Sequence, residues 1–307
     1  MTDLSRYSLI RSLMILVFSL FTGTLSAQTV IEMDKGGLVR NKTLRDYDRE
    51  IQLEETKNDS LKYVDCLTRA FNALHVDSLN EARVYFQEAL TLRPQAPGNY
   101  LVKKHLAEIN EAQGDFKGAS VLYSEILKER PEMHQVRVAR AAVNVQQRFY
   151  QEALADCDYL IKLNHALSAE RLYFIRATAL MGLRLHREAR KDFESVILLN
   201  PDNLNAPILL AISLHDDGQH QEALNRLNLH LQNHPENVDA LVLRANFFME
   251  LKSYDAALRD LTEAIHLAPQ RPDIYAERAV CYDHLKNTEA ARADRLMVGK
   301  LTNTVFE

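Results

Sequence analysis

The chain has 307 residues with only 9 glycines, 8 prolines and no tryptophan, so it is poor in the turn residues that an all-β protein needs. Hydrophobic residues make up 47% of the chain, which is ample for a helical core. The formal net charge of −5 argues against a protein that binds the phosphate backbone of nucleic acids, because such proteins present a clearly basic face.

Residues 1–27 have the pattern of a secretory signal peptide. Arg6 and Arg11 precede an apolar run that is shorter than the ~20 residues a membrane span needs. Small and polar residues follow, so we predict export with cleavage after Ala27. An uncleaved membrane anchor is the alternative, because Leu25 is larger than the residue expected two places before the cleavage site.

Residues 28–62 are polar, mixed in charge and contain two adjacent glycines, which is typical of a tether. Within this stretch, residues 44–56 have the composition of a short helix. We expect the ordered core to begin near Asp59 or Ser60, because either side chain can cap a helix N-terminus through its oxygen.

From residue 63 to residue 301 the chain repeats itself. Seven units begin at 63, 100, 134, 170, 204, 238 and 272, so successive steps are 37, 34, 36, 34, 34 and 34 residues. Columns 8 and 20 of the aligned units are alanine in every unit, and a methyl group is the largest side chain that a close helix crossing tolerates. The fourteen alanines are Ala70, Ala82, Ala107, Ala119, Ala141, Ala153, Ala177, Ala189, Ala211, Ala223, Ala245, Ala257, Ala279 and Ala291.

Other columns mark the ends of a helix pair. Proline stands at column 32 in most units and ends the second helix, because it lacks an N–H and its ring clashes with the preceding turn. Gly114 and Gly218 stand at column 15, between the helices, where glycine most easily adopts a left-handed backbone. The third unit departs from this pattern with His165 in place of proline, and the seventh departs with Arg295 at the otherwise apolar column 24.

These columns resemble the tetratricopeptide repeat family, with about seven repeats over residues 63–301. The resemblance implies an all-α fold, a right-handed α-solenoid of helix pairs, followed by a tail at 302–307. Arg295 is what a terminal helix should carry, because no further repeat covers it.

Columns 7 and 23 vary together. Column 7 is arginine in five repeats, and column 23 is aspartate in four of those five. Where column 7 is leucine, column 23 is never acidic, so we predict an ion pair between the two helices of a repeat. The alternative is that both columns face water and the correlation is inherited through duplication. The predicted pairs are Arg140–Asp156, Arg176–Asp192, Arg244–Asp260 and Arg278–Asp294.

Cys66, Cys157 and Cys281 fall in repeats 1, 3 and 7. A repeat of a solenoid contacts only its neighbours, whereas a disulfide needs Cα atoms within ~7 Å. We therefore predict three free thiols that pack as small hydrophobic side chains.

The chain shows no phosphate-cradling glycine loop, nucleophile elbow or paired-carboxylate motif, so we expect no enzyme and no cofactor. His215 and His220, and the pair His230 and His234, have spacings that can hold a metal. Ordinary turn and packing roles explain them more simply, so we expect no metal and keep a metal-dependent activity near His215 and His220 as the lesser alternative.

In the family that the chain resembles, the first helices line a concave groove, and columns 2, 5, 9, 12 and 13 face it. Here these columns form an apolar floor with an acidic edge, which suits a segment with apolar anchors and basic residues. The alternative is that column 5 is core between neighbouring repeats. The candidate groove residues are Leu67, Phe71, Lys104, Val138, Phe174, Ile208, Ile212, Val242, Asn246, Asp216, Asp239 and Glu250.

Some members of this family clamp a C-terminal carboxylate, and Lys104 could begin such a clamp. Glu108 stands where the clamp needs asparagine and Ala139 follows in the next repeat, so the clamp is incomplete. We expect a scaffold or adaptor of the bacterial periplasm or envelope that binds a protein or peptide, and a holdase chaperone for apolar segments is the alternative. Membrane contact is expected only if the signal segment is not cleaved, and the sequence does not predict the oligomeric state.

Overall fold

The computed structural model describes the backbone of residues 30–33, 39–42, 57–163 and 169–302, and the side chains of 59–163 and 169–302. The signal peptide and the helix predicted at 44–56 lie outside the described residues. So does all of the predicted tail except its first residue, Thr302.

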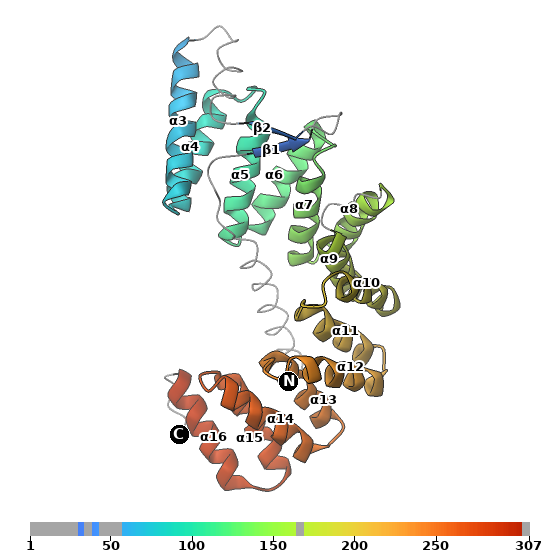
Figure 1. Cartoon of the computed structure of the whole chain (residues 1–307). Helices are drawn as coiled ribbons and strands as arrows, with labels where there is room; N and C mark the ends of the chain where they lie inside the picture. Colours follow the sequence, from blue (N-terminus) through green and yellow to red (C-terminus); the bar gives the residue numbers. More distant parts are fainter. Residues whose placement is uncertain (1–29, 34–38, 43–56, 164–168, 303–307) are drawn as a thin grey trace. The chain divides into compact units, whose positions relative to one another are not determined.

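A short β-hairpin lies in the predicted tether (Figure 1). Strands β1 (Val30–Met33) and β2 (Val39–Lys42) pair antiparallel, with Val30 opposite Lys42. The two adjacent glycines between them in the sequence are a recognised hairpin signal, which a reading based on polarity alone overlooked.

Helices make up the rest of the described chain and fall into two compact units, one ending at His165 and one beginning at Ala166. The N-terminal unit contains α3 (Lys57–His75), α4 (Leu79–Leu92), α5 (Asn99–Ala112), α6 (Phe116–Glu129), α7 (His134–Gln146) and α8 (Tyr150–Lys162). The C-terminal unit contains α9 (Ala169–Gly182), α10 (His186–Leu199), α11 (Asn205–Asp216), α12 (His220–Asn233), α13 (Val238–Glu250), α14 (Tyr254–Leu267), α15 (Pro272–His284) and α16 (Thr288–Thr302).

The helices pack in consecutive pairs, one pair for each sequence unit (Figure 1). Helix α3 packs on α4, α5 on α6, and so on to α15 on α16, and the second helix of a pair then packs on the first helix of the next pair within each unit. This arrangement confirms the predicted all-α solenoid of helix pairs. We call the pairs repeats 1 to 7, with repeats 1–3 in the N-terminal unit and repeats 4–7 in the C-terminal unit.

The alanines of columns 8 and 20 lie in the core of every repeat. Thirteen of the fourteen have no exposed surface, and Ala279 is 2% exposed. Large side chains at column 24, such as Phe86, Phe193 and Leu261, are also fully buried. Each helix pair is therefore built around two methyl-sized contacts, and in five of the seven repeats a large buried side chain at column 24 flanks them.

The first helix begins earlier than we expected. Helix α3 starts at Lys57, so Asp59 lies in its first turn and is not its N-cap. Ser60 is buried, and its hydroxyl accepts a hydrogen bond from Arg93 at 2.9 Å. The cap prediction was wrong because this serine bonds a side chain from the end of α4.

The turn between the two helices is the same in all seven repeats. The residue at column 15 has φ between 58° and 79° in each, although only Gly114 and Gly218 are glycine. The following amide donates to the carbonyl five residues back, as Ser253 does to Phe248 at 2.8 Å. This is a Schellman ending, which satisfies carbonyls left free at a helix C-terminus. The hydrogen bonds thus impose the left-handed backbone on Asp77, Arg148, Arg184, Lys252 and Lys286.

Exchanging residue types at column 15 tests this conclusion. A Cβ added at Gly218 would touch nothing within 4 Å, so the Gly218→Ala variant isolates the backbone term. We expect this variant to lose about 1 kcal/mol of unfolding free energy, and the converse variant Lys252→Gly to gain up to about 1 kcal/mol. Urea unfolding curves of the two variants and the parent measure both effects. A loss of stability in both variants would contradict the conclusion.

Candidate functional site

Five of the predicted groove residues belong to the core. Leu67, Val138, Ile208, Ile212 and Val242 are each at most 7% exposed. The prediction that they form the floor of a groove is therefore wrong. The alternative that column 5 is a packing column holds for Leu67, Val138, Ile208 and Val242, and Ile212 is a buried residue of column 9.

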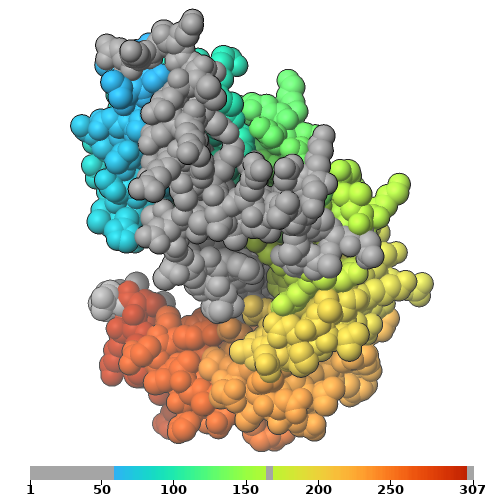
Figure 2. Space-filling model, turned by 45° about the horizontal axis from the view of Figure 1, so that its top comes forward, coloured from blue at the N-terminus to red at the C-terminus, as the bar shows by residue number. Residues whose placement is uncertain are grey.

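Fewer inner-column side chains of the C-terminal unit are accessible than the sequence predicted. Phe174 on α9 and Asn246 on α13 are half-buried, and Val280 on α15 is 42% exposed. The repeats of this unit, coloured yellow to red in Figure 2, form one continuous surface. A partner can therefore touch side chains of several first helices, but it cannot insert into an apolar floor. In the N-terminal unit Phe71 and Lys104 are likewise half-buried.

At one end of the predicted acidic edge, an arginine of the chain itself neutralises two carboxylates. The Arg271 guanidinium contacts Asp239 and Asp273, both at 2.6 Å. Burial opposes the charge of this guanidinium, but the two carboxylates outweigh it and raise the pKa of Arg271. Asp239 lies in the first turn of α13 and Asp273 in that of α15, so Arg271 links the two repeats.

The other end of the edge surrounds a buried histidine. The His215 Nε2 atom lies 2.9 Å from the Glu250 carboxylate, and its ring stacks on Phe247 with centroids 4.0 Å apart. Asp216 is exposed beside it at the end of α11. This cluster places carboxylates of repeats 5 and 6 close to one another at the ends of their first helices.

The histidine pairs of the sequence have structural contacts. The rings of His215 and His220 lie 4.5 Å apart, but Asp217 between them contacts Arg190 at 3.0 Å. The Asn237 amide contacts His230 Nε2 at 2.9 Å, and Asn237 is also the N-cap of α13. Within the described ranges no group of three or more His, Cys, Asp or Glu side chains could hold a metal ion.

Lys104 is not free to begin a carboxylate clamp. Its ammonium group contacts Glu108 one turn along α5, and His105 Nδ1 lies 3.0 Å from the other oxygen of Glu108. Burial alone would raise the pKa of Glu108, but the hydrogen bond from His105 and the charge of Lys104 lower it to about 2. The inner face of repeat 2 therefore carries an ion pair whose cation is already engaged.

The structure brings together all four arginine–aspartate pairs of columns 7 and 23. In each pair Nε and Nη2 of the arginine donate to the two carboxylate oxygens at 2.6–2.8 Å. The aspartates are at most 7% exposed, and the arginines approach them from the first helix of the same repeat. Such a bidentate geometry is the strongest form of carboxylate recognition by arginine.

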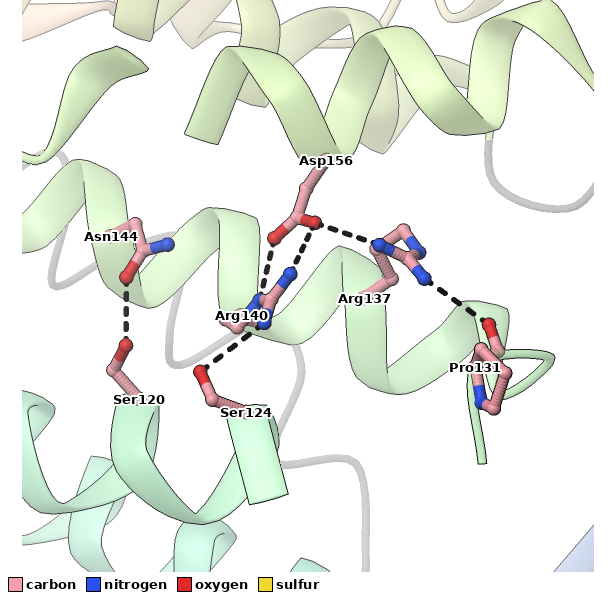
Figure 3. Close-up of polar contacts among 7 residues, drawn as sticks. All are labelled: Ser120, Ser124, Pro131, Arg137, Arg140, Asn144 and Asp156. Atoms are coloured by element: carbon pink, nitrogen blue, oxygen red, sulfur yellow. Dashed lines mark hydrogen bonds and ion pairs between the residues drawn. The ribbon is translucent and has the colours of Figure 1, made fainter. Parts of the chain in front are cut away.

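Three of these arginines, Arg140, Arg244 and Arg278, also reach the preceding repeat. Figure 3 shows the contact in repeat 3, where Arg140 joins Asp156 and also donates to the Ser124 hydroxyl of α6 at 3.2 Å. Arg244 donates to Asn228 at 2.7 Å in the same manner, and Arg278 to Thr262 at 3.3 Å. Each of these partners stands at column 25. We call this arrangement of columns 7, 23 and 25 the arginine bridge.

Comparison of columns 7 and 23 alone missed column 25. In repeats 2, 5 and 6 it is serine, asparagine or threonine, which share a hydrogen-bonding oxygen but carry no charge, whereas repeats 3 and 4 have Asp158 and Glu194 there.

Repeat 5 has no arginine bridge of its own, because Leu210 replaces arginine at column 7. A different ion pair links it to the preceding repeat. There Arg226, at column 23, lies 3.5 Å from Glu194 at column 25 of repeat 4. In repeat 1, Arg69 lies over the ring of Tyr85, 5.7 Å from its centroid.

The family model described as "Tetratricopeptide repeat" matches residues 176–238, 209–272 and 242–296, which lie in repeats 4 to 7. Residues 176–296 of the chain therefore consist of tetratricopeptide repeats. Repeats 1 to 3 share the buried alanines and the turn of the matched repeats.

Known tetratricopeptide repeat proteins are similar to parts of the chain. Tetratricopeptide repeat protein 12 of Mus musculus is 30% identical over 94 residues, which are 30% of this chain and only 13% of that protein. The crystal structure of a tetratricopeptide repeat protein from Parabacteroides merdae superimposes with a TM-score of 0.66 at 18% identity, covering 78% of this chain and 93% of the other. MamA from Desulfovibrio magneticus RS-1 reaches a TM-score of 0.48 at 16% identity, over 56% of this chain and 96% of its own.

Replacing an arginine bridge by leucines, as in repeat 2, tests its role in a tetratricopeptide repeat. Arg244→Leu leaves Asp260 buried without its bidentate partner, so we expect a loss of about 2–4 kcal/mol in unfolding free energy. The double variant Arg244→Leu/Asp260→Leu copies Leu106 and Leu122 of repeat 2, and we expect it to recover at least half of that loss.

Urea unfolding of Arg244→Leu, Asp260→Leu and the double variant, compared with the parent chain, completes a double-mutant cycle. If the double variant is less stable than Arg244→Leu, the aspartate has partners that outweigh the arginine and our interpretation of the pair is wrong.

The three cysteines are buried and free. Cys157 and Cys281 have no exposed surface and Cys66 is 5% exposed. Burial, together with the nearby Glu277 carboxylate, raises the pKa of the Cys281 thiol to about 11. No described helix combines the length and the apolar character needed to cross a bilayer.

These thiols should be inert in the native protein. We expect a water-soluble thiol reagent to label none of Cys66, Cys157 and Cys281 until denaturant is added, because the thiolate must be both formed and exposed to react. Mass spectrometry of timed samples gives the number of labels. Rapid single labelling of the folded protein would contradict the burial of one cysteine.

Proposed function

We propose that this tetratricopeptide repeat protein is a non-enzymatic scaffold of the bacterial cell envelope that binds a protein or peptide partner. Stacked helix pairs create an extended surface from residues that are far apart in sequence, and such surfaces serve as binding faces in repeat proteins. The observation that carries the proposal is the presence of accessible inner-column side chains on the first helices of repeats 4, 6 and 7.

Phe174, Asn246 and Val280 come from α9, α13 and α15 and stand at columns 5 and 9. An aromatic ring, an amide and an aliphatic side chain in series offer apolar contacts with one hydrogen-bonding group. This set suits an amphipathic helix or an extended segment that carries apolar anchors. The buried column 5 residues beneath fix the spacing of these first helices.

Carboxylates at the edge of this face favour a partner that carries basic residues. Asp216 and Glu250 are exposed at the ends of α11 and α13, where Glu250 also contacts His215, and Asp239 and Asp273 are engaged by the cation of Arg271. A basic residue of the partner therefore finds accessible carboxylates near the ends of the helices of repeats 5 and 6, and not near their beginnings. Complementary charges at such a rim guide orientation more than they raise affinity.

Export is the other half of the proposal, and it is supported by the sequence alone. Two arginines followed by an apolar run and small residues are typical of a signal peptide. Fractionation of cells that express the full chain tests whether it is exported. An N-terminus at Gln28 in the exported protein is expected.

Binding is tested with peptides that carry leucine anchors and lysines. The variant Asp216→Lys/Val280→Lys changes two exposed inner residues, and Asp255→Lys/Leu267→Lys makes the same charge change on the outer helix α14. We expect the inner variant to lose about tenfold or more in affinity, measured by fluorescence anisotropy, and the outer variant less than about twofold.

Equal losses in the two variants would show that the inner face is not the recognition surface. Tight, saturable binding of one peptide sequence supports a scaffold. Weak binding of many apolar peptides, unaffected by either variant, would contradict the scaffold and indicate a holdase.

A further inference from the structure

Column 6 is a packing position in the C-terminal unit. Ile175, Leu209 and Leu243 occupy it in repeats 4, 5 and 6, and each is at most 7% exposed. Repeat 7 has Glu277 at the same place on α15. A carboxyl group therefore stands where the preceding repeats place a branched aliphatic side chain.

The polar contacts of Glu277 are incomplete. Its Oε1 accepts a long hydrogen bond of 3.4 Å from the Asn246 amide on α13, the first helix of repeat 6. Its Oε2 is buried and has no hydrogen-bond partner among the described residues. A half-buried carboxylate with one buried, unpaired oxygen and one weak donor is costly, because the charge has left water without full compensation.

The charged groups around Glu277 do not supply that compensation. Asp273 lies one turn before it on α15, Cys281 one turn after it, and Arg271 in the segment that precedes α15. Arg271 is already engaged by Asp273 and by Asp239 of α13. Among the described residues, no charged group of α14 or α16 is recorded as acting on this carboxyl group.

The balance of these contacts favours the neutral acid. Burial raises the pKa of Glu277 to about 7, the Asp273 carboxylate adds to the rise, and the Asn246 hydrogen bond and Arg271 oppose it. A carboxyl group with such a pKa changes its charge close to neutral pH, where an ordinary glutamate is fully ionised.

We propose that Glu277 makes the junction between repeats 6 and 7 sensitive to pH, so that ionisation of this carboxyl group favours opening of the last repeat. While the group is neutral, α15 packs on the preceding repeat as column 6 residues do elsewhere. When the group ionises, the buried charge is relieved by exposing it to water, which separates α15 and α16 from repeat 6.

The direction of the pH effect follows from proton linkage. The folded repeat holds the proton more tightly than the open one, because its pKa lies above the ordinary value of 4.5. The extra stability is therefore fully present below that ordinary value and is lost as pH rises through the folded pKa near 7. Repeat 7 should therefore open more often as the pH rises from mildly acidic to mildly alkaline.

Amide hydrogen exchange of the full chain measures this opening directly. We expect the protection factors of α15 and α16, which are corrected for intrinsic exchange, to fall by up to about tenfold between about pH 6 and about pH 8. Amides of α11 and α12 in the same protein serve as the internal reference and should not change.

Three variants test whether ionisation of Glu277 causes the fall in the protection factors. Glu277→Gln and Glu277→Leu should each remove the fall, and the leucine variant, which copies repeats 5 and 6, should also raise protection at both pH values. Glu289→Gln, at an exposed position in the first turn of α16, is the matched control and should keep the fall. A fall that persists in Glu277→Gln, or constant protection in the parent chain, would overturn the proposal.

Discussion

Close contact at two alanine positions governs the whole arrangement. Because Ala177 and Ala189 and their counterparts are fully buried, the helices of a repeat approach at a distance that no larger side chain allows. That approach sets where column 24 packs, where the turn must fall and which faces remain for the next repeat. The accessible face of the first helices and the arginine bridges are consequences of this constraint, because both depend on the resulting spacing of the first helices.

Repetition is what made much of this structure predictable. A single unit would have revealed little, but seven aligned units expose which columns are invariant and which vary together. The helix pairs, the buried cysteines and the partners of Arg140, Arg176, Arg244 and Arg278 could be inferred in this way. Each depends on contacts within one repeat, so each leaves its mark in the alignment of that repeat.

Features that involve two repeats were predicted less well. Ile208 and Val242 looked like a groove floor because the sequence does not show what covers them, and the structure buries them beneath neighbouring helices. Column 25 went unnoticed because its hydrogen-bond acceptors differ chemically from repeat to repeat. One feature within a repeat was also missed, because the left-handed residue at column 15 was expected only for glycine, although the hydrogen bonds of the turn impose it on Lys252 as well.

The arginine bridge also bears on how such a chain can gain or lose whole repeats. Excision of repeat 5 would bring Arg244 against Glu194, two groups of opposite charge, and excision of repeat 6 would bring Arg278 against Asn228, the partner that Arg244 has now. Both shortened chains would keep a matched polar contact at the new junction. Length in this part of the protein can thus vary by complete units without a compensating substitution.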